Sequence, residues 1–245
     1  MESGVLPLCR RIAADLDALA VVLVGSHARG TATAESDVDL VALGAGPGYQ
    51  LSRREGRLVS LSWRTPDEQR SRFRSPGPAL TEVPGWRSAV IITDPGGIAA
   101  GLQRSALDWS WEQVAGPARA WVAAELTGYA EEVHKLASAL RTGRPRLAAA
   151  QRSLLALHLP FVLAVHFETL HASENEVWDA IARRAGEPWR AAQDRALGLE
   201  GESLADSCRG ALEMYALAAG VAGERLGERE RSVVSAAVAA ARSVL

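Results

Sequence analysis

The chain has 245 residues, of which 48% are hydrophobic, and its formal net charge is −2 with a pI near 6.2. This length suits one large core or two smaller ones. The nearly balanced charge offers no strong attraction to nucleic acid, so we expect a small-molecule partner and no nucleic-acid ligand. Cys9 and Cys208 are far apart and belong to no zinc-type cluster, which indicates a reducing, cytoplasmic location. The longest apolar stretch, residues 154–167, is too short to span a bilayer, so we expect no membrane segment.

The first half of the sequence alternates short apolar runs with turn residues. This pattern predicts a helix over 6–19, strands over 21–24, 37–43, 57–63 and 90–92, and a helix over 98–111. Thr65-Pro66, followed by two acids, predicts a helix start. The glycine-rich residues 44–48 lack the spacing of a dinucleotide fingerprint and predict a flexible hairpin connection. Residues 70–87, rich in Arg, Pro and Gly, are expected to be irregular.

Gly116-Pro117 marks the predicted junction between two domains, residues 1–115 and 116–245. Beyond it the composition is rich in Ala, Leu, Glu and Arg with helical spacing and no strand pattern. Helices are predicted over 117–140, 146–170, 174–185, 188–196, 204–222 and 229–244. Pro160 is expected to kink or divide its helix, and Ser173 with Glu176 fits a capping box.

Residues 21–43 carry the most informative pattern of the chain. A β-branched run, Val21 to Val24, ends abruptly at a glycine, which is typical of a buried strand. Asp37 and Asp39 follow with one apolar residue between them, so in a strand both carboxylates leave the same face. Two such carboxylates repel each other unless a cation lies between them. Mg²⁺ is the expected metal, because it takes oxygen ligands and shares its remaining positions with nucleotide phosphates.

The turn after the first strand supplies groups suited to a phosphate. Gly25 allows close approach of the backbone, and the Ser26 hydroxyl donates to phosphate oxygens. Arg29 is placed to add a charge-assisted contact. Gly25, Ser26 and Arg29 are therefore candidate nucleotide-binding residues.

Gly25-Ser26 followed by Asp37-Val38-Asp39 resembles the signature of the DNA polymerase β-like nucleotidyltransferase superfamily, hG[GS] and then Dh[DE]h. Within it, the chain looks most like the kanamycin-type antibiotic nucleotidyltransferases, which act on aminoglycosides or lincosamides. The resemblance implies an α/β fold with a small mixed-sheet catalytic domain followed by a C-terminal helical bundle. It also implies Mg²⁺-dependent transfer of a nucleoside monophosphate, AMP from ATP, onto a hydroxyl of a small molecule such as an aminoglycoside-like antibiotic. A homodimer is a further expectation from the family.

The sequence departs from the superfamily pattern on the strand predicted over 57–63. A third carboxylate often lies there in the superfamily, whereas this chain offers Ser60 and Ser62. A second metal would then be held less firmly, or the third acid would come from elsewhere. The missing acid motivates one alternative, a catalytically degenerate relative that binds a nucleotide or a partner protein. The resemblance leaves another alternative among enzymes, the transfer of AMP to a protein hydroxyl, as in toxin–antitoxin relatives of this superfamily.

The only lysine of the chain, Lys135, lies four residues after Glu131 in a predicted helix. A single ammonium in an arginine-rich chain suggests a specific use, although an ordinary surface ion pair has the same spacing. Kanamycin-type enzymes carry a Glu and a Lys at this spacing, so the resemblance implies that Glu131 is the general base and Lys135 a phosphate ligand. Aligning Tyr129-Ala130 with a Tyr-Ala pair of that family points instead to Glu125 as the base, and Glu132 is a third candidate.

Overall fold

The computed structural model describes residues 4–199 and 201–245, which form two compact units. The first unit ends at Val114 and the second begins at Ala115. The division falls where helix α6 (Ala115–Arg141) begins, so Gly116 and Pro117 lie inside the first turn of a helix and not in a linker loop. Proline is tolerated in a first helical turn, because the N–H groups there have no partner within the helix.

The first unit is built on a five-stranded sheet with the strand order β3-β4-β2-β1-β5. Strands β2 and β4 are parallel and all other neighbours are antiparallel, so the sheet is mixed. This sheet and the helical second unit confirm the predicted fold class. The elements of the first unit are α1 (Val5–Ala14), β1 (Ala20–Val24), α2 (Gly25–Arg29), β2 (Val38–Leu43), β3 (Tyr49–Arg54), β4 (Arg57–Arg64), α3 (Pro66–Arg74), α4 (Pro76–Arg87), β5 (Val90–Thr93), α5 (Ile98–Leu107) and η1 (Trp111–Val114).

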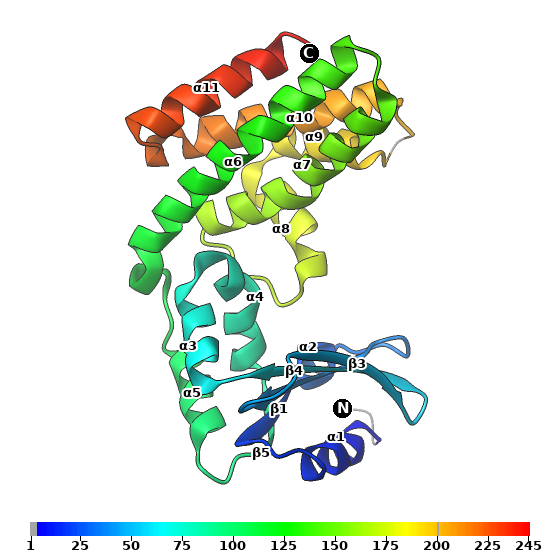
Figure 1. Cartoon of the computed structure of the whole chain (residues 1–245), viewed down its shortest axis with the longest axis vertical. Coiled ribbons are helices and arrows are strands. Elements are labelled where there is room, and N and C mark those ends of the chain that lie inside the picture. Colours follow the sequence, from blue (N-terminus) through cyan, green and yellow to red (C-terminus); the bar gives the residue numbers. More distant parts are fainter. Residues whose placement is uncertain (1–3, 200) are drawn as a thin grey trace. The chain divides into compact units, whose positions relative to one another are not determined.

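Helix α1 covers one face of this sheet (Figure 1). Its Leu8 and Cys9 are buried in a cluster with Leu23 of β1, Leu40 of β2 and Val59 of β4. These strand residues alternate with side chains that point to the other face, where α5 packs against β1 and α3 against β4. One face of the sheet is thus closed by α1, and Asp39 of β2 belongs to the other face.

Two segments of this unit differ from the prediction. Tyr49–Arg54 forms the edge strand β3, although no strand was expected there. Pro76–Arg87 forms helix α4, where irregular structure was expected. Pro76 occupies the first turn of α4, where proline costs little, and buried Leu80 and Trp86 stabilise the helix despite Pro84 in its interior.

Helix α1 also ends earlier than predicted, at Ala14 and not at residue 19. The backbone N–H groups of Asp15 and Leu16 donate to Ile12 O and Ala13 O, at 3.1 and 3.3 Å. Such three-residue hydrogen bonds tighten and close a helix end. In contrast, the predicted start of α3 is confirmed: Thr65 and Glu68 form a reciprocal capping box.

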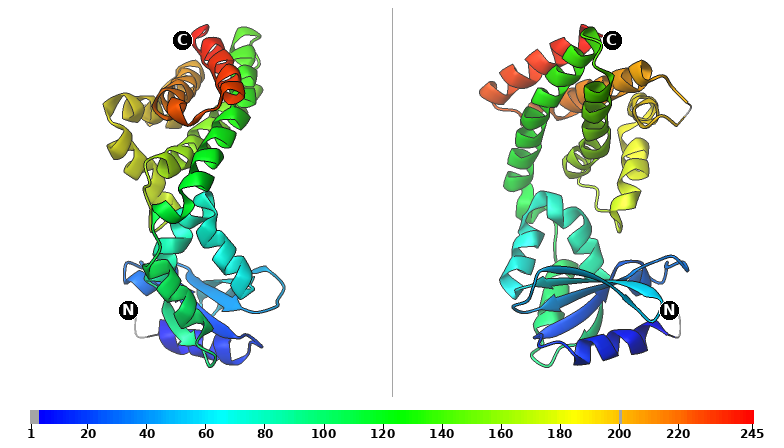
Figure 2. Two further views of the ribbon diagram at one scale, coloured as in Figure 1. Left: turned by 90° about the vertical axis from the view of Figure 1, so that its left-hand side faces the viewer. Right: turned by 45° about the vertical axis from the view of Figure 1, so that its right-hand side comes forward.

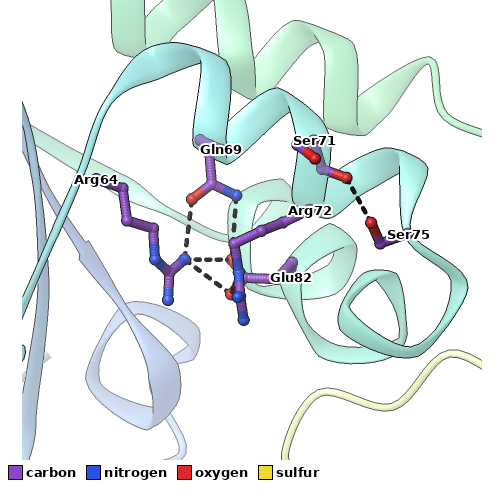
Figure 3. Close-up of polar contacts among 6 residues, drawn as sticks. All are labelled: Arg64, Gln69, Ser71, Arg72, Ser75 and Glu82. Carbon is purple, nitrogen blue, oxygen red and sulfur yellow. Dashed lines mark hydrogen bonds and ion pairs between the residues drawn. The ribbon is translucent and has the colours of Figure 1, made fainter.

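Glu82 of α4 is the centre of a polar cluster that joins three elements (Figure 3). Arg64, at the end of β4, donates from Nη1 to both carboxylate oxygens of Glu82 at 2.8 Å. Arg72 of α3 donates from Nε at 2.6 Å, and the Gln69 amide donates at 3.1 Å. The Glu82 side chain is only 11% exposed, so these donors replace the water that it loses on folding.

In its described residues, the second unit has helices and no strand, and α10 lies at its centre. Helix α10 packs against α6, α7, α9 and α11, and α6 lies beside α7 (Figures 1 and 2). The Tyr215 hydroxyl of α10 is buried and donates to Leu126 O at 2.8 Å. The elements after α6 are α7 (Pro145–His166), η2 (Glu174–Glu176), α8 (Val177–Ala185), α9 (Glu187–Leu197), α10 (Leu204–Ala222), η3 (Gly223–Arg225) and α11 (Glu228–Arg242).

Helix α7 lies close to its predicted range of 146–170 but ends earlier, at His166. It continues through Pro160 without being divided, and Leu159 and Val162 on either side are fully buried. It begins at Pro145, next to the predicted start, and it is the helix in the described part of the chain that is long and apolar enough to cross a membrane. More than half of that apolar window is buried, as in the core helix of a bundle.

The predicted capping box after α7 is only partly formed. The Ser173 hydroxyl accepts from Asn175 N at 3.3 Å, and the Glu176 carboxylate accepts from Ala172 N at 3.2 Å. The resulting turn is the short helix η2, and α8 begins only at Val177. Glu174 and Glu176, the two acids of this segment, therefore lie in a turn that joins α7 to α8.

Candidate functional site

The motif residues meet where β1 ends and β2 begins. Val24, the last residue of β1, pairs with Asp39 of β2, and Gly25 follows with a φ of +72°. A Cβ at Gly25 would lie 2.2 Å from the Oδ2 atom of Asp39. Both the left-handed backbone and this close approach require glycine. The turn thus brings Gly25 directly beside the carboxylate, and Ser26 follows Gly25 in α2.

Ser60 holds the other oxygen of Asp39. Strands β2 and β4 place Asp39 and Ser60 opposite each other, and the Ser60 hydroxyl donates to Asp39 Oδ1 at 2.6 Å. Burial raises the pKa of Asp39, and the Ser60 hydrogen bond opposes that rise. The negative charge of Asp37, just before β2, raises the pKa further, whereas His27 and Arg29 lower it. The carboxylate is therefore fixed on one side by Gly25 and on the other by Ser60.

The structure assigns different places to the two serines of β4. Ser60 is buried and bonded to Asp39, whereas Ser62 lies two residues further along β4, opposite Val41 and Tyr49. Because the Ser60 hydroxyl acts as a donor to Asp39, it stabilises one carboxylate and adds no negative charge to the site. The sequence showed that an acid is missing from β4, but only the sheet register shows what replaces it.

These residues suit a divalent cation that a nucleotide also binds. No three His, Cys, Asp or Glu side chains gather into a metal-holding group in residues 4–199 and 201–245. Mg²⁺ needs no such group, because one or two carboxylates with substrate phosphates complete its oxygen shell. Asp37 and Asp39 are near enough to interact, and burial of Asp39 disfavours its charge unless a cation compensates it. The donor set thus fits one Mg²⁺.

His27 is a site residue whose burial the sequence did not reveal. It lies in α2 between Ser26 and Arg29, is only 2% exposed, and its charge influences Asp39. Its Nε2 atom has no hydrogen-bond partner in the part of the chain that the structure describes. A polar residue in a short turn gives no periodic signal of burial, so both a buried and an exposed position fitted the sequence.

In the second unit, Glu131 and Lys135 form the predicted pair on α6, with 2.7 Å between Oε1 and Nζ. Glu132 lies 3.6 Å from the same ammonium. The Glu131 side chain is 71% exposed, and its hydrogen bond with Lys135 lowers the pKa of Glu131 and raises that of Lys135. Glu131 therefore resembles one partner of a surface ion pair and not a carboxylate adapted to accept a proton.

Glu125, one and a half turns earlier on α6, has a different environment. Burial raises its pKa, although the nearby His158 opposes that rise. Tyr129 stacks on His158 with ring centroids 6.0 Å apart, and burial raises the pKa of Tyr129 to about 12. A cavity of about 360 Å³ between α6 and α7 is lined by these residues together with Glu131 and Glu132. All three candidate bases thus border one cavity, in which burial raises the pKa of Glu125 and the bond to Lys135 lowers that of Glu131.

Comparison with known proteins agrees with the architecture of the first unit. Residues 8–77 match the family model described as a nucleotidyltransferase domain, and this segment contains Gly25, Asp37, Asp39 and Ser60. The segment that carries these residues thus matches a class of domain whose general reaction is nucleotidyl transfer. The resemblance to the polymerase β-like superfamily is supported at this level, whereas the closeness to kanamycin-type enzymes stays a prediction.

The whole fold is similar to that of a solved protein. The crystal structure of a nucleotidyltransferase-like protein from Exiguobacterium sibiricum superposes with a TM-score of 0.52 and 14% sequence identity. The alignment covers 98% of this chain and 77% of that one, and at this identity it shows the fold alone. No curated protein matches the chain in sequence.

Proposed function

We propose that the protein transfers a nucleoside monophosphate, AMP from ATP, onto a hydroxyl of a small molecule. The observation that carries this proposal is the Asp39 carboxylate, fixed between Gly25 and the Ser60 hydroxyl with Asp37 beside it. In this proposal Asp37 and Asp39 hold Mg²⁺, and Ser26 and Arg29 bind the triphosphate. When bound, the metal neutralises phosphate charge and orients the α-phosphate for attack.

The reaction is an in-line displacement at the α-phosphorus. A bond forms between the acceptor oxygen and the α-phosphorus, and the bond from phosphorus to the bridging oxygen of pyrophosphate breaks. The acceptor hydroxyl loses its proton to a carboxylate, and the leaving pyrophosphate keeps the electron pair of the broken bond. The chain needs a proton acceptor and a cation for the leaving group, and Lys135 is proposed for the second role.

We propose Glu125, in place of Glu131, as the proton acceptor. A general base works best when its pKa lies near the working pH, and burial moves the pKa of Glu125 in that direction. The ion pair with Lys135 moves the pKa of Glu131 the opposite way. Glu132 is also near Lys135 and remains the third candidate.

The proposal is tested by incubating the protein with Mg²⁺, ATP labelled at the α-phosphate, and acceptors of three kinds: kanamycin, lincomycin and a mixture of unrelated proteins. We expect pyrophosphate release and a labelled small molecule, both abolished by EDTA. Label on protein alone would indicate the protein AMP-transferase. Nucleotide binding without any pyrophosphate release would indicate the degenerate relative, for which the neutral Ser60 is the motivating observation.

The assignment of the base gives a second prediction. Glu125→Gln should lower kcat about 10²-fold or more while the KM for ATP changes little, because only proton transfer is lost. Glu131→Gln, matched in chemistry and on the same helix, should retain kcat within about twofold, because its partner Lys135 is solvated. The reverse result, with Glu131→Gln inactive and Glu125→Gln active, would move the base back to the residue expected from the sequence.

A further inference from the structure

An apolar patch lies on the same face of the sheet as Asp39. It consists of Tyr49 and Leu51 of β3 and Leu58 of β4, whose exposed fractions are 64%, 54% and 46%. We call these three residues the β3–β4 patch. Val59 and Leu61, which point to the other face of β4, are buried under α1. Three large apolar side chains are thus exposed on the face that carries the candidate site.

The register of the sheet joins the β3–β4 patch to the site. Leu51 pairs with Ser60, and Ser60 pairs with Asp39, so these three residues form one row across β3, β4 and β2. Paired residues of neighbouring strands point to the same face, as the hydrogen bond between Ser60 and Asp39 also shows. Two strand spacings separate Leu51 from Asp39, which is about 10 Å.

The chemistry of the reaction sets the direction from which the acceptor arrives. Gly25 and Ser26 lie on the β1 side of Asp39, where the proposed function places the triphosphate. In an in-line displacement, the attacking and leaving oxygens lie on opposite sides of the α-phosphorus. With pyrophosphate leaving toward β1, the acceptor oxygen approaches from the β4 and β3 side. That is the side on which Ser60 and then Leu51 follow Asp39.

We propose that the β3–β4 patch binds the apolar part of the hydroxyl acceptor while its oxygen attacks the α-phosphorus. This inference rests on the proposed function and adds the chemical class of its acceptor. The acceptor is an alcohol with an apolar or aromatic face roughly 10 Å or less from its reacting hydroxyl. Its oxygen bonds to the α-phosphorus, its proton passes to the base, and pyrophosphate leaves with the electrons of the broken bond.

A peptide added to the free edge of β3 fits the geometry less well. The added strand would lie one spacing beyond β3, about 14 Å from the row position of Asp39. A serine or threonine hydroxyl on that strand reaches only about 2–3 Å from its own Cα, too little to reach a metal-bound α-phosphate. A compact molecule lying across β4 and β3 covers the distance, so the face of the sheet and not its edge is the acceptor surface.

Two simple alcohols serve as probes, because they share the reacting hydroxyl and differ in apolar surface. With Mg²⁺ and labelled ATP, we expect the full-length protein to transfer AMP to benzyl alcohol with at least tenfold higher kcat/KM than to glycerol. Leu51→Ser and Tyr49→Ser should each lower this ratio by about tenfold, since each removes exposed apolar surface that the aromatic ring covers. Binding of Mg²⁺ with α,β-methylene-ATP, measured by calorimetry, should stay within about twofold.

Two control variants match these substitutions. Leu107→Ser changes an equally exposed leucine at the end of α5, and Gln50→Ser changes the opposite face of β3. Both should keep the wild-type ratio. An equal rate with benzyl alcohol and glycerol would overturn the acceptor assignment and leave the proposed function standing. No transfer to any alcohol, or no binding of the nucleotide analogue, would overturn the proposed function and this inference with it.

Other occupants of the β3–β4 patch have their own signatures. If a second copy of the chain covers it, Leu51→Ser lowers the oligomeric mass measured by light scattering and leaves the ratio unchanged. If another part of the same chain covers it, Leu51→Ser lowers the melting temperature without changing either the mass or the ratio. Either result contradicts the acceptor assignment.

Discussion

Asp39→Asn is expected to reduce nucleotidyl transfer by about 10²-fold or more while the protein keeps its fold. The substitution removes a proposed metal ligand but preserves the shape of the side chain. The amide oxygen of the asparagine can still accept from the Ser60 hydroxyl. The asparagine is about as large as the aspartate, so the close approach of Gly25 to this side chain is preserved. The loss should therefore appear in catalysis and metal binding, with no loss of folded protein.

The same variant should be at least as stable as the wild-type protein without metal. Burial raises the pKa of Asp39 in the folded state, so the folded protein binds this proton more tightly than the unfolded chain does. The stability that protonation contributes is present at low pH and is lost as the pH rises through the raised pKa. An asparagine is neutral at every pH and avoids that loss.

Thermal melts at neutral and acidic pH, with and without Mg²⁺, measure both effects. At neutral pH without metal, the Asp39→Asn variant should melt at or above the wild-type temperature, and Mg²⁺ with ATP should stabilise only the wild-type protein. Glu35→Gln, which removes an exposed nearby charge, is the matched control and should behave as wild type. Full transfer activity in Asp39→Asn would contradict the proposal that Asp39 is a metal ligand.

Glu82→Ala is expected to destabilise the first unit by about 3 kcal/mol, the lower end of the range for breaking a buried ion pair. The carboxylate accepts from Arg64, Arg72 and Gln69 (Figure 3), and its removal leaves Arg64 without its ion-pair partner. The Arg64 side chain is 21% exposed and regains little water, whereas Arg72, at 39%, is better solvated. We therefore expect a smaller loss of stability than if both arginines were left as fully buried, unpaired charges.

Urea unfolding followed by circular dichroism, compared with the wild-type curve, checks this prediction. Asp67→Ala is the matched control, because Asp67 also pairs with an arginine, Arg70, but its side chain is 93% exposed. That variant should differ from wild type by less than about 1 kcal/mol. Equal stability of Glu82→Ala and Asp67→Ala would show that the cluster around Glu82 contributes no more than a surface pair.

The parts of the fold with strong periodic signals were predictable, and the parts stabilised by tertiary contacts were not. Strands β1 and β2 are apolar runs that end at turn residues, so their existence and type were clear. Strand β3 is exposed at almost every position, and its apolar alternation is limited to Tyr49 and Leu51, which is too short to predict a strand. Helix α4 contains three prolines and two glycines in twelve residues, and only the burial of its apolar side chains explains why it is helical.

The same distinction between local sequence signals and tertiary contacts applies to the residues of the candidate site. The spacing of Asp37 and Asp39 predicted a common face for a strand that contains both, whereas β2 begins at Val38 and leaves Asp37 just before the strand. The partnership of Ser60 with Asp39 depends on which residues of β2 and β4 lie side by side, and no local pattern encodes that register. The choice between Glu125 and Glu131 depends on burial within the helical unit, whereas the sequence offered only the spacing to Lys135.

Each of the two units contains one buried thiol, whose rate of alkylation reports how often that unit opens. The chain has two cysteines, Cys9 in the first unit and Cys208 in the second, and both are buried. Burial raises the pKa of Cys9 to about 11 and also raises that of Cys208, so neither is a reactive thiolate at neutral pH. An alkylating reagent therefore labels each cysteine only when its surroundings open. After digestion, mass spectrometry shows whether the peptide with Cys9 or the peptide with Cys208 is alkylated first. That order shows which unit opens first, without any engineered probe.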